Sequence, residues 1–308
     1  MEVARGVFAQ EGRLSVTDME APLTDEQYVY IRELVLDRSS VALDEAKHYL
    51  IDSRLQGMTR EHGFSSMSDM AMDLMSHGDS PLHREVVERL LTGETSWFRD
   101  HHPFELLREE VIPKLMAARA QLRTLTIWCG ACSTGQEPYS IAMLLQEHFP
   151  ALSSWRVRII ATDLSEKMLE RTRRAEYSQL EINRGLPAPL LVKYFEQDGR
   201  NWKLKESVRD MVEVKPLNLV GRWDALPDSV DVIFLRNVLI YFEIPIKKKI
   251  LASVRKHLAQ DGCLFLGGAE TTFNIDEDFE RPPNVSGSWY QLRDPAAEPV
   301  RSNLEWAR

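Results

Sequence analysis

The chain has 308 residues, 44% hydrophobic and 28% charged, which is typical of a globular protein with one large domain or two modest ones. Its apolar runs are far shorter than the ~20 residues that cross a bilayer, and a formal net charge of −9 argues against nucleic-acid binding through phosphate contacts. Three cysteines are too few for a disulfide framework, and the first ten residues lack the apolar core of a secretory signal. We therefore expect a cytoplasmic protein without membrane insertion.

The N-terminal part predicts a flexible tail over residues 1–22 and a small helical domain over residues 23–92. Thr24 can cap a helix whose first turn holds Asp25 and Glu26, the charges favoured at that end. Apolar residues then recur at helical spacing in segments 28–35, 43–58, 67–75 and 85–91. The net charge is −11 over residues 1–110 and +2 over the rest, which also indicates two modules.

The predicted secondary structure changes after residue 122, where strands begin to alternate with helices. Strands are predicted at 122–128, 155–162, 230–235, 262–267 and 288–292, and helices at 137–149, 166–174 and 246–258. This alternation predicts an α/β fold with a mostly parallel, doubly wound sheet over residues 123–294, followed by a tail at 295–308. Short polar–apolar stretches between residues 194 and 217 interrupt the rhythm and predict an inserted antiparallel β flap.

The loop after the first strand, Trp128–Ser140, is the most informative stretch. Gly130 and Gly135 let the backbone approach a ligand, and the loop lies where α/β folds bind ligands. It matches neither a phosphate-binding P-loop nor the GxGxxG pattern. Asp163, at the end of the next strand, could accept both hydroxyls of a ribose. By pattern alone, a nucleotide-like ligand and a tight turn without a ligand are equally open.

The same loop contains Trp128-Cys-Gly-Ala-Cys132, which looks like a redox WCxxC motif. Such a motif needs a helix N-terminus to lower the pKa of a thiol. Here the helix is expected to begin near Glu137, too far from Cys129, and Ala131 stands where proline is usual. We therefore disfavour redox chemistry.

Five ordered blocks resemble the CheR family of chemotaxis receptor methyltransferases, over about residues 24–293. The blocks are Thr95–Asp100 (TSWFRD), Ala131–Ala142 (ACSTGQEPYSIA), Ala161–Asp163 (ATD), Phe234–Phe242 (FLRNVLIYF) and Gly267–Glu270 (GGAE). The resemblance implies a Rossmann-like methyltransferase that uses S-adenosylmethionine and releases S-adenosylhomocysteine. It also implies that residues 93–122 form a linker helix contributing cofactor contacts, and that no metal takes part.

The resemblance assigns cofactor residues one by one. Arg99 would pair with the carboxylate of the methionine end, Glu137 would lie near its ammonium group, and Asp163 would hold the ribose. The full cofactor set is Gly93, Thr95, Arg99, Gly130, Glu137, Asp163, Asn218, Leu219, Asn237 and Val238. Gly93 replaces the family's asparagine, and Gly268 and Ala269 replace its histidine and serine.

For the transfer step, the resemblance implies that a receptor glutamate attacks the methyl carbon. An exposed glutamate is ionised at pH 7, so no general base is required. We assign Arg236 and Tyr241, which follow the fourth strand, to positioning the acceptor carboxylate, with Arg99 as the third catalytic residue.

In the helical domain, the family docks a basic helix on the cytoplasmic helices of methyl-accepting chemotaxis receptors. Lys47, Arg54 and Arg60 are the candidate cations, although a plain solvated surface is an equally open interpretation and the domain is acidic overall. The flap loop 196–201 is short and contains only Gly199. This favours an enzyme that does not depend on a receptor-tail pentapeptide.

Two other functions stay in view. One is a methyltransferase of the same fold that acts on a different protein or a small molecule. The other is a non-catalytic, cofactor-binding regulatory protein. The helical domain and flap favour receptor methylation over the first, and the presence of Arg99, Asp163, Asn237 and Tyr241 argues against the second.

Overall fold

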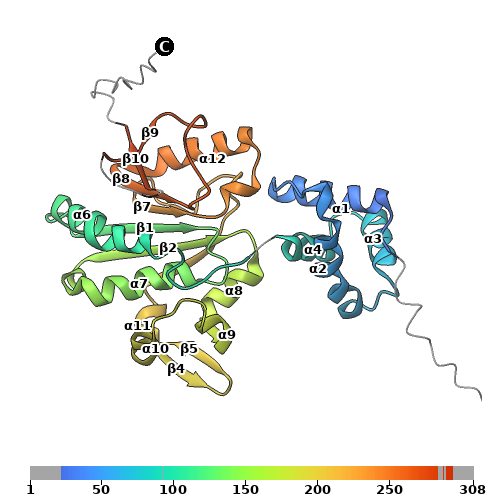
Figure 1. Cartoon of the computed structure of the whole chain (residues 1–308), viewed down its shortest axis with the longest axis horizontal. Coiled ribbons are helices and arrows are strands. Elements are labelled where there is room, and N and C mark those ends of the chain that lie inside the picture. Colours follow the sequence, from blue (N-terminus) through green and yellow to red (C-terminus); the bar gives the residue numbers. More distant parts are fainter. Residues whose placement is uncertain (1–21, 92, 284–286, 288, 294–308) are drawn as a thin grey trace, which may run out of the picture. The chain divides into compact units, whose positions relative to one another are not determined.

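The computed structural model describes residues 22–91, 93–283, 287 and 289–293. Apart from residue 22, the tails predicted at 1–22 and 295–308 lie outside these residues. The chain divides into two compact units (Figure 1). Among the described residues, the first unit comprises 22–38 and 42–91, and the second comprises 39–41 and the residues from 93 onward.

The described part of the first unit contains helices and no strand. Its α-helices are α1 (Asp25–Ser39), α2 (His48–Glu61), α3 (Met67–Ser76) and α4 (Pro81–Leu90). Thr24 caps α1 as expected: its Oγ1 accepts the Gln27 N–H at 3.3 Å, and Gln27 Oε1 accepts the Thr24 N–H at 2.9 Å. This reciprocal pair is a capping box, which satisfies donors that a helix start leaves open.

The helix predicted over residues 43–58 begins later than expected. Asp44 accepts the N–H of Ala46 at 3.0 Å and starts a 3-10 turn, η2 (Glu45–Lys47), before α2 begins at His48. An aspartate that bonds its local backbone competes with an α-helical start. Lys47 and Arg54 therefore do not share one continuous α-helix.

The second unit is built on a seven-stranded sheet with the strand order β6-β2-β1-β7-β8-β10-β9. Its strands are β1 (Thr124–Gly130), β2 (Arg156–Asp163), β6 (Val212–Pro216), β7 (Val230–Leu235), β8 (Leu258–Leu266), β9 (Phe279–Glu280) and β10 (Trp289–Leu292). Neighbouring strands pair in parallel from β6 through β2, β1 and β7 to β8. Strand β10 pairs antiparallel with β8, and β9 pairs antiparallel with β10. The doubly wound prediction is confirmed. The winding reverses between β1 and β7, which is where such sheets bind ligands.

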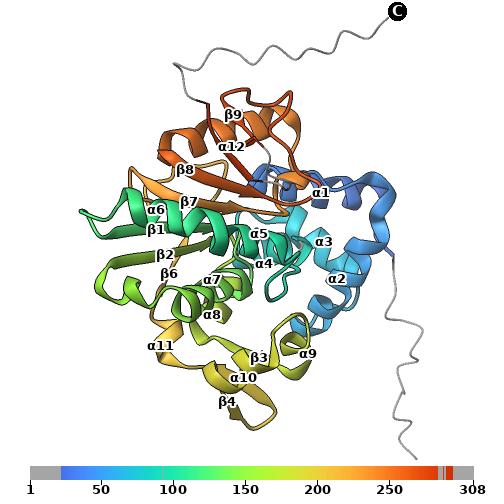
Figure 2. The ribbon, with the colours of Figure 1, turned by 60° about the vertical axis from the view of Figure 1, so that its left-hand side comes forward.

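Helices cover both faces of this sheet (Figure 2). A continuous helical stretch, made of α5 (His102–Leu106), the π-helical turn η3 (Leu107–Val111) and α6 (Ile112–Ala118), shares a buried core with α7 (Gln136–His148) and β1. On the other face, α12 (Ile244–His257) is linked to β1 by Trp223, whose ring lies 4.8 Å from that of Trp128 and 5.4 Å from that of His257. Residues 102–118 are thus part of the second unit's core rather than a separate linker.

A second, three-stranded antiparallel sheet with the order β3-β5-β4 projects beside the large sheet (Figures 1 and 2). It contains β3 (Glu176–Ser178), β4 (Phe195–Asp198) and β5 (Asn201–Leu204), flanked by α9 (Gln179–Ile182), α10 (Ala188–Tyr194) and α11 (Glu206–Arg209). The flap therefore exists, but its predicted extent of 194–217 was wrong at both ends. It recruits β3 from outside that range, whereas β6 pairs in parallel with β2.

The physical reason is that alternation of polar and apolar residues identifies a strand but not its partner. The edge position of β6 is fixed by non-local contacts, including the Arg158–Glu213 ion pair at 2.8 Å. Between β2 and the flap lies α8 (Glu166–Arg174), which Ser165 caps by accepting the Met168 N–H. In the part of the chain described, no helix has the length and apolar character needed to cross a membrane.

Candidate active site

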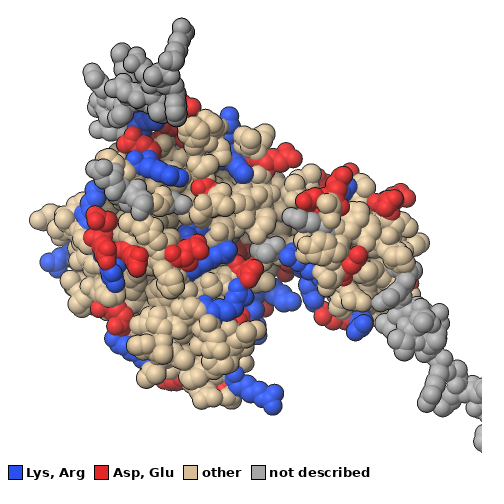
Figure 3. Space-filling view, viewed as in Figure 1, with Lys and Arg blue, Asp and Glu red and all other residues tan. Residues whose placement is uncertain are grey.

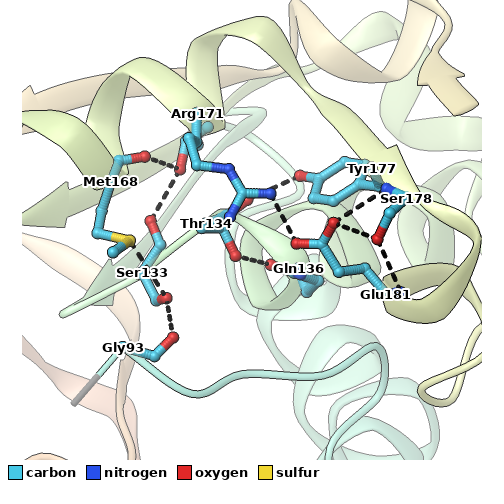
Figure 4. Close-up of polar contacts among 10 residues, drawn as sticks. Gly93, Ser133, Thr134, Gln136, Met168, Arg171, Tyr177, Ser178 and Glu181 are labelled. Carbon is cyan, nitrogen blue, oxygen red and sulfur yellow. Dashed lines mark hydrogen bonds and ion pairs between the residues drawn. The ribbon is translucent and has the colours of Figure 1, made fainter. Parts of the chain in front are cut away.

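The loop between β1 and α7 is held in an unusual backbone conformation. Ala131 and Ser133 have φ values of +55° and +52°, and Gly135 has +92°. Side chains from neighbouring elements fix this loop (Figure 4): Tyr177 donates to the Thr134 carbonyl at 2.8 Å, and Ser133 Oγ donates to the Gly93 carbonyl. Residues without glycine's freedom keep such conformations only where the surroundings impose them, commonly at ligand sites.

The two glycines predicted to bind cofactor have distinct surroundings. A Cβ at Gly130 would lie 2.9 Å from Leu235 Cδ1, so glycine there allows β1 and β7 to pack. Gly93 is exposed, but a Cβ would lie 3.3 Å from both Met168 Cε and Ser133 Oγ. Both positions adjoin the loop, and packing alone is enough to account for Gly130.

Asp163 ends β2 and joins three chain segments. Its Oδ2 accepts the Ser133 N–H at 2.8 Å and its Oδ1 accepts the Ser165 N–H at 2.9 Å. Its carbonyl accepts the Leu217 N–H at 3.0 Å, which brings Asn218 and Leu219 to the same end of the sheet. Burial raises the pKa of the Asp163 carboxyl, and the backbone N–H groups oppose this rise.

Arg236, at the end of β7, is the centre of a buried charge network. Its guanidinium donates to Glu137 at 2.8 Å, to Asp100 at 2.7 Å and to the Arg99 carbonyl at 2.9 Å. The Arg236 side chain is only 1% exposed. Burial raises the pKa of Glu137, while Arg236 and then Arg99 lower it. Arg236 thus joins the first turn of α7 to the segment that carries Arg99.

That segment, residues 97–101, is also strained. Phe98, Asp100 and His101 have φ values of +46°, +67° and +47°. The Phe98 N–H donates to Ser140 Oγ at 3.1 Å, and Arg236 holds the segment from the other side. Arg99 is half-buried and donates to the Glu94 carbonyl at 3.1 Å. Thr95, also half-buried, immediately precedes this segment.

The turn after β7 carries the remaining predicted residues. Asn237 has φ +57°, and the N–H groups of Asn237 and Val238 donate to the Glu270 carboxylate at 2.7 and 2.9 Å. Tyr241 ends the 3-10 turn η5 (Leu239–Tyr241) and is half-buried. The backbone donors of Asn237 and Val238 are therefore already used.

The structure brings most of the assigned cofactor residues to one edge of the sheet. They sit at the carboxyl ends of β1, β2, β6 and β7 and on the 93–99 segment, which hydrogen bonds tie to these ends. Sequence reasoning gave no role to Asp100, Ser133 or Glu270. All three lie inside blocks that carried the resemblance, but their long-range partners leave no local signal.

The docking candidates of the first unit do not form a single basic face. Arg54 donates to the Leu90 carbonyl and so anchors the end of α4. Arg60 is exposed in the last turn of α2. The side chain of Lys47 lies outside the described residues. Of the three, Arg60 has a solvent-exposed side chain in the described structure.

The two cysteines of the loop do not fit redox chemistry. Cys129 and Cys132 are free and buried, and burial raises the pKa of both thiols well above the ordinary value. The thiolate is the reactive form, so both are disfavoured as nucleophiles. Within the described residues, no group of three or more His, Cys, Asp or Glu side chains could hold a metal ion.

The donor set fits a cofactor that carries a ribose and a cationic amino acid. The carboxylate of Asp163 suits hydroxyl groups, and the buried Glu137 carboxylate suits an ammonium. Together with the doubly wound sheet, this donor set suits a Rossmann-like, S-adenosylmethionine-dependent methyltransferase. Residues 93–286 match the family model described as CheR methyltransferase, SAM binding domain.

Curated relatives agree over most of the chain. Chemotaxis protein methyltransferase Cher2 of Pseudomonas putida is 36% identical over 82% of this chain and 93% of its own. Chemotaxis protein methyltransferase 1 of Pseudomonas aeruginosa is 37% identical over the same shares. The chemotaxis protein methyltransferase of Vibrio parahaemolyticus is 35% identical over 88% of this chain and 98% of its own. The chain belongs to the CheR methyltransferase family, which confirms the resemblance.

Proposed function

We propose that this enzyme methylates glutamate side chains on the cytoplasmic helices of methyl-accepting chemotaxis receptors. The products are glutamate methyl esters and S-adenosylhomocysteine. The supporting observation is that hydrogen bonds join residues from all five family blocks at one edge of the sheet, around Arg236, Asp163 and Glu270. The test is transfer of a labelled methyl group to receptor-containing membranes, where base-labile label indicates a carboxyl ester.

The outcomes of this test separate the alternatives. Base-stable label, or label on a small molecule, would indicate a methyltransferase with another substrate. Cofactor binding without any methyl transfer would indicate a regulatory protein.

Methyl transfer to a carboxylate requires the residues of the site to align the reactants, and it requires no proton transfer. Bound S-adenosylmethionine supplies an electrophilic methyl group on its sulfonium. The acceptor carboxylate is already ionised, so the residues must hold it in line with the S–CH3 bond and keep water away. We assign Asp163 to the ribose, Glu137 to the ammonium and Arg99 to the carboxylate of the cofactor.

The geometry changes the role we assign to Arg236. Its guanidinium is fully buried and already paired with Glu137 and Asp100. We therefore assign Arg236 to holding Glu137 and the Arg99 segment in place, rather than to direct contact with the acceptor. Tyr241, half-buried at the end of the β7 turn, remains the residue assigned to the acceptor carboxylate.

The Tyr241→Phe variant is expected to lower kcat by about 10–100-fold, because one hydrogen bond to a charged group contributes roughly 1.5–3 kcal/mol. Affinity for S-adenosylhomocysteine, measured by calorimetry, should change little. Tyr194→Phe is the matched control, since its hydroxyl donates to Glu147 in the last turn of α7. A normal kcat for Tyr241→Phe would remove this residue from the mechanism.

Receptor docking rests on few cations. On the face drawn in Figure 3, acidic and basic side chains are interspersed rather than gathered into one basic patch. We propose that Arg60 contributes locally to docking on an acidic receptor helix. We also propose that the enzyme does not need a receptor-tail peptide, because β4 and β5 are joined by a tight turn at Gly199, with φ +59°.

The Arg60→Glu variant is expected to raise the KM for receptor about 5-fold at low ionic strength and to leave the KM for S-adenosylmethionine unchanged. The effect should shrink as salt is added, because salt screens exposed charges. Initial rates over a salt series measure it. Arg84→Glu, an exposed arginine on α4, is the control, and equal effects of both variants would count against a specific role for Arg60.

A further inference from the structure

Glu270 lies beside the active-site turn and has no assigned role. It is only 5% exposed, and its two carboxylate oxygens accept five backbone N–H groups. Oε1 accepts those of Val238 at 2.9 Å, Leu239 at 2.6 Å and Ile240 at 3.3 Å, and Oε2 accepts those of Asn237 at 2.7 Å and Gly267 at 2.6 Å. The side chain thus acts as an internal anion in a nest of backbone donors.

Two features of the turn that Glu270 holds would be unfavourable without its carboxylate. Asn237 has φ +57°, and a non-glycine residue in that conformation costs roughly 1–3 kcal/mol. The four consecutive N–H groups of residues 237–240 start a short 3-10 turn, where such donors lack partners within the turn. One carboxylate satisfies all four. Without it, the positive φ and the buried donors would both favour rearrangement of the turn.

We propose that Glu270 is a positioning residue for methyl transfer, which acts by fixing the turn that carries Asn237, Val238 and Tyr241. This rests on the proposed function, since Tyr241 is the residue assigned there to the acceptor carboxylate. The N–H of Tyr241 donates to the Val238 carbonyl at 3.2 Å. The backbone of Tyr241 therefore belongs to the same turn that Glu270 holds.

Gly267 packs closely against the same turn and against Glu270. A Cβ there would lie 2.7 Å from Asn237 Nδ2, 2.7 Å from Glu270 Oε2 and 2.9 Å from the Asn237 N atom. At Gly268, the next residue, no atom lies within 4 Å of such a Cβ. The chain thus offers a matched pair: Gly267→Ala pushes the turn away from Glu270 without changing any charge, and Gly268→Ala should not.

The first test compares Glu270→Gln with wild type. The amide has nearly the same size, but its NH2 group must face two or three N–H donors, whichever way it is turned. We expect kcat for receptor methylation to fall about 100-fold, the scale of a misplaced catalytic group. The KM for S-adenosylmethionine should rise by a smaller factor, because the same turn carries Asn237 and Val238, which are assigned to the cofactor. Gly267→Ala should show the same split between kcat and KM, and Gly268→Ala should behave as wild type.

Asp231→Asn controls for a purely structural effect. Asp231 is a buried carboxylate that accepts the Thr126 N–H at 2.7 Å and pairs with Arg119 at 3.0 Å, away from the β7 turn. Its loss should lower the melting temperature without changing kcat below that temperature. All kinetics are measured on the full chain, at temperatures where circular dichroism shows each variant folded.

The outcomes separate this inference from the proposed function. If wild type methylates receptor but Glu270→Gln and Gly267→Ala retain its kcat, Glu270 is not a positioning residue. A fall in kcat no larger than that of Asp231→Asn, or of Gly268→Ala, would overturn the inference equally. If wild type itself transfers no methyl to receptor, the proposed function fails instead.

Discussion

Replacing Arg236 with methionine is expected to lower affinity for S-adenosylmethionine about 100-fold and to destabilise the fold by roughly 3–5 kcal/mol. Removing one partner of a buried ion pair leaves the other charge uncompensated, which carries a penalty of about this size. Here the charge left uncompensated is that of Glu137. Burial raises the pKa of its carboxyl, and Arg236 opposes that rise. Without Arg236 this pKa rises further, so a larger fraction of Glu137 is protonated and it pairs less strongly with the ammonium of the cofactor.

The variant should also release the segment that carries Arg99. Arg236 donates to Asp100 and to the Arg99 carbonyl, and Asp100 has φ +67°. Loss of these bonds removes two restraints on a strained segment, so the fraction of enzyme with Arg99 correctly placed should fall. We therefore expect kcat to drop as well as cofactor affinity, a combination that a simple loss of binding would not produce.

The Arg236 prediction is measured by calorimetry with S-adenosylhomocysteine and by thermal unfolding. Arg119→Met is the matched control: Arg119 bonds Asp231 and Asp261 at 3.0 and 2.8 Å, so its loss should reduce stability but not cofactor affinity. A double-mutant cycle with Glu137→Gln isolates the pair. If Arg236→Met weakens binding as much in the Glu137→Gln background as in wild type, the two residues are not coupled.

Elements with strong local signals could be predicted closely from the sequence. Strand β7 has its predicted bounds, Val230–Leu235, because it is a short apolar run covered on both faces. Helix α8 has its predicted bounds, Glu166–Arg174, because Ser165 provides a local cap. In both cases the information lies within a few residues of the boundary, where a single sequence is sufficient.

Features that depend on distant partners could not be predicted in this way. Strand β6 was placed in the flap because its alternation suits an edge strand of either sheet. The pairing of Arg236 with Asp100 and Glu137 joins residues 136 and 99 positions apart. A surface pairing with substrate and a buried pairing with the protein's own carboxylates require the same residue type, so the sequence alone could not separate them.

The contacts of Arg54 bear on the uneven distribution of charge between the two parts of the chain. The acidic N-terminal module was expected to meet an acidic receptor helix through Lys47, Arg54 and Arg60. Because Arg54 bonds the Leu90 carbonyl, at least one of these cations has a structural task within its own unit. The proposed docking would therefore rely on fewer cations than these three, or on contacts that are not electrostatic, and a weak salt dependence would be the sign of the latter.

The Asp163→Asn variant is expected to weaken binding of S-adenosylmethionine by about 100-fold and to leave kcat at saturating cofactor nearly unchanged. The carboxylate accepts the N–H groups of Ser133 and Ser165 at 2.8 and 2.9 Å. An amide would turn its NH2 group against one of them and would also lose an acceptor for a ribose hydroxyl. An unsatisfied buried donor costs roughly 1–3 kcal/mol, and two such losses account for the expected change.

The pH dependence gives a second readout for the same residue. Burial raises the pKa of Asp163 above its ordinary value of 3.8. Only the ionised form accepts hydrogen bonds at both oxygens, so affinity should be lost as pH falls through this raised pKa. The Asp163→Asn variant should lack that acidic limb. Calorimetric titration of S-adenosylhomocysteine from pH 8 down to the acid limit of the folded protein measures both effects.

Asp198→Asn, at an exposed position of the flap, is the matched control and should titrate as wild type does. Asp163 would lose its assignment to the ribose if its asparagine variant bound cofactor within about 3-fold of wild type, a difference below 1 kcal/mol. It would lose it equally if the acidic limb persisted in that variant. In either event the acceptor for the ribose must be sought elsewhere at the carboxyl ends of β1 and β2.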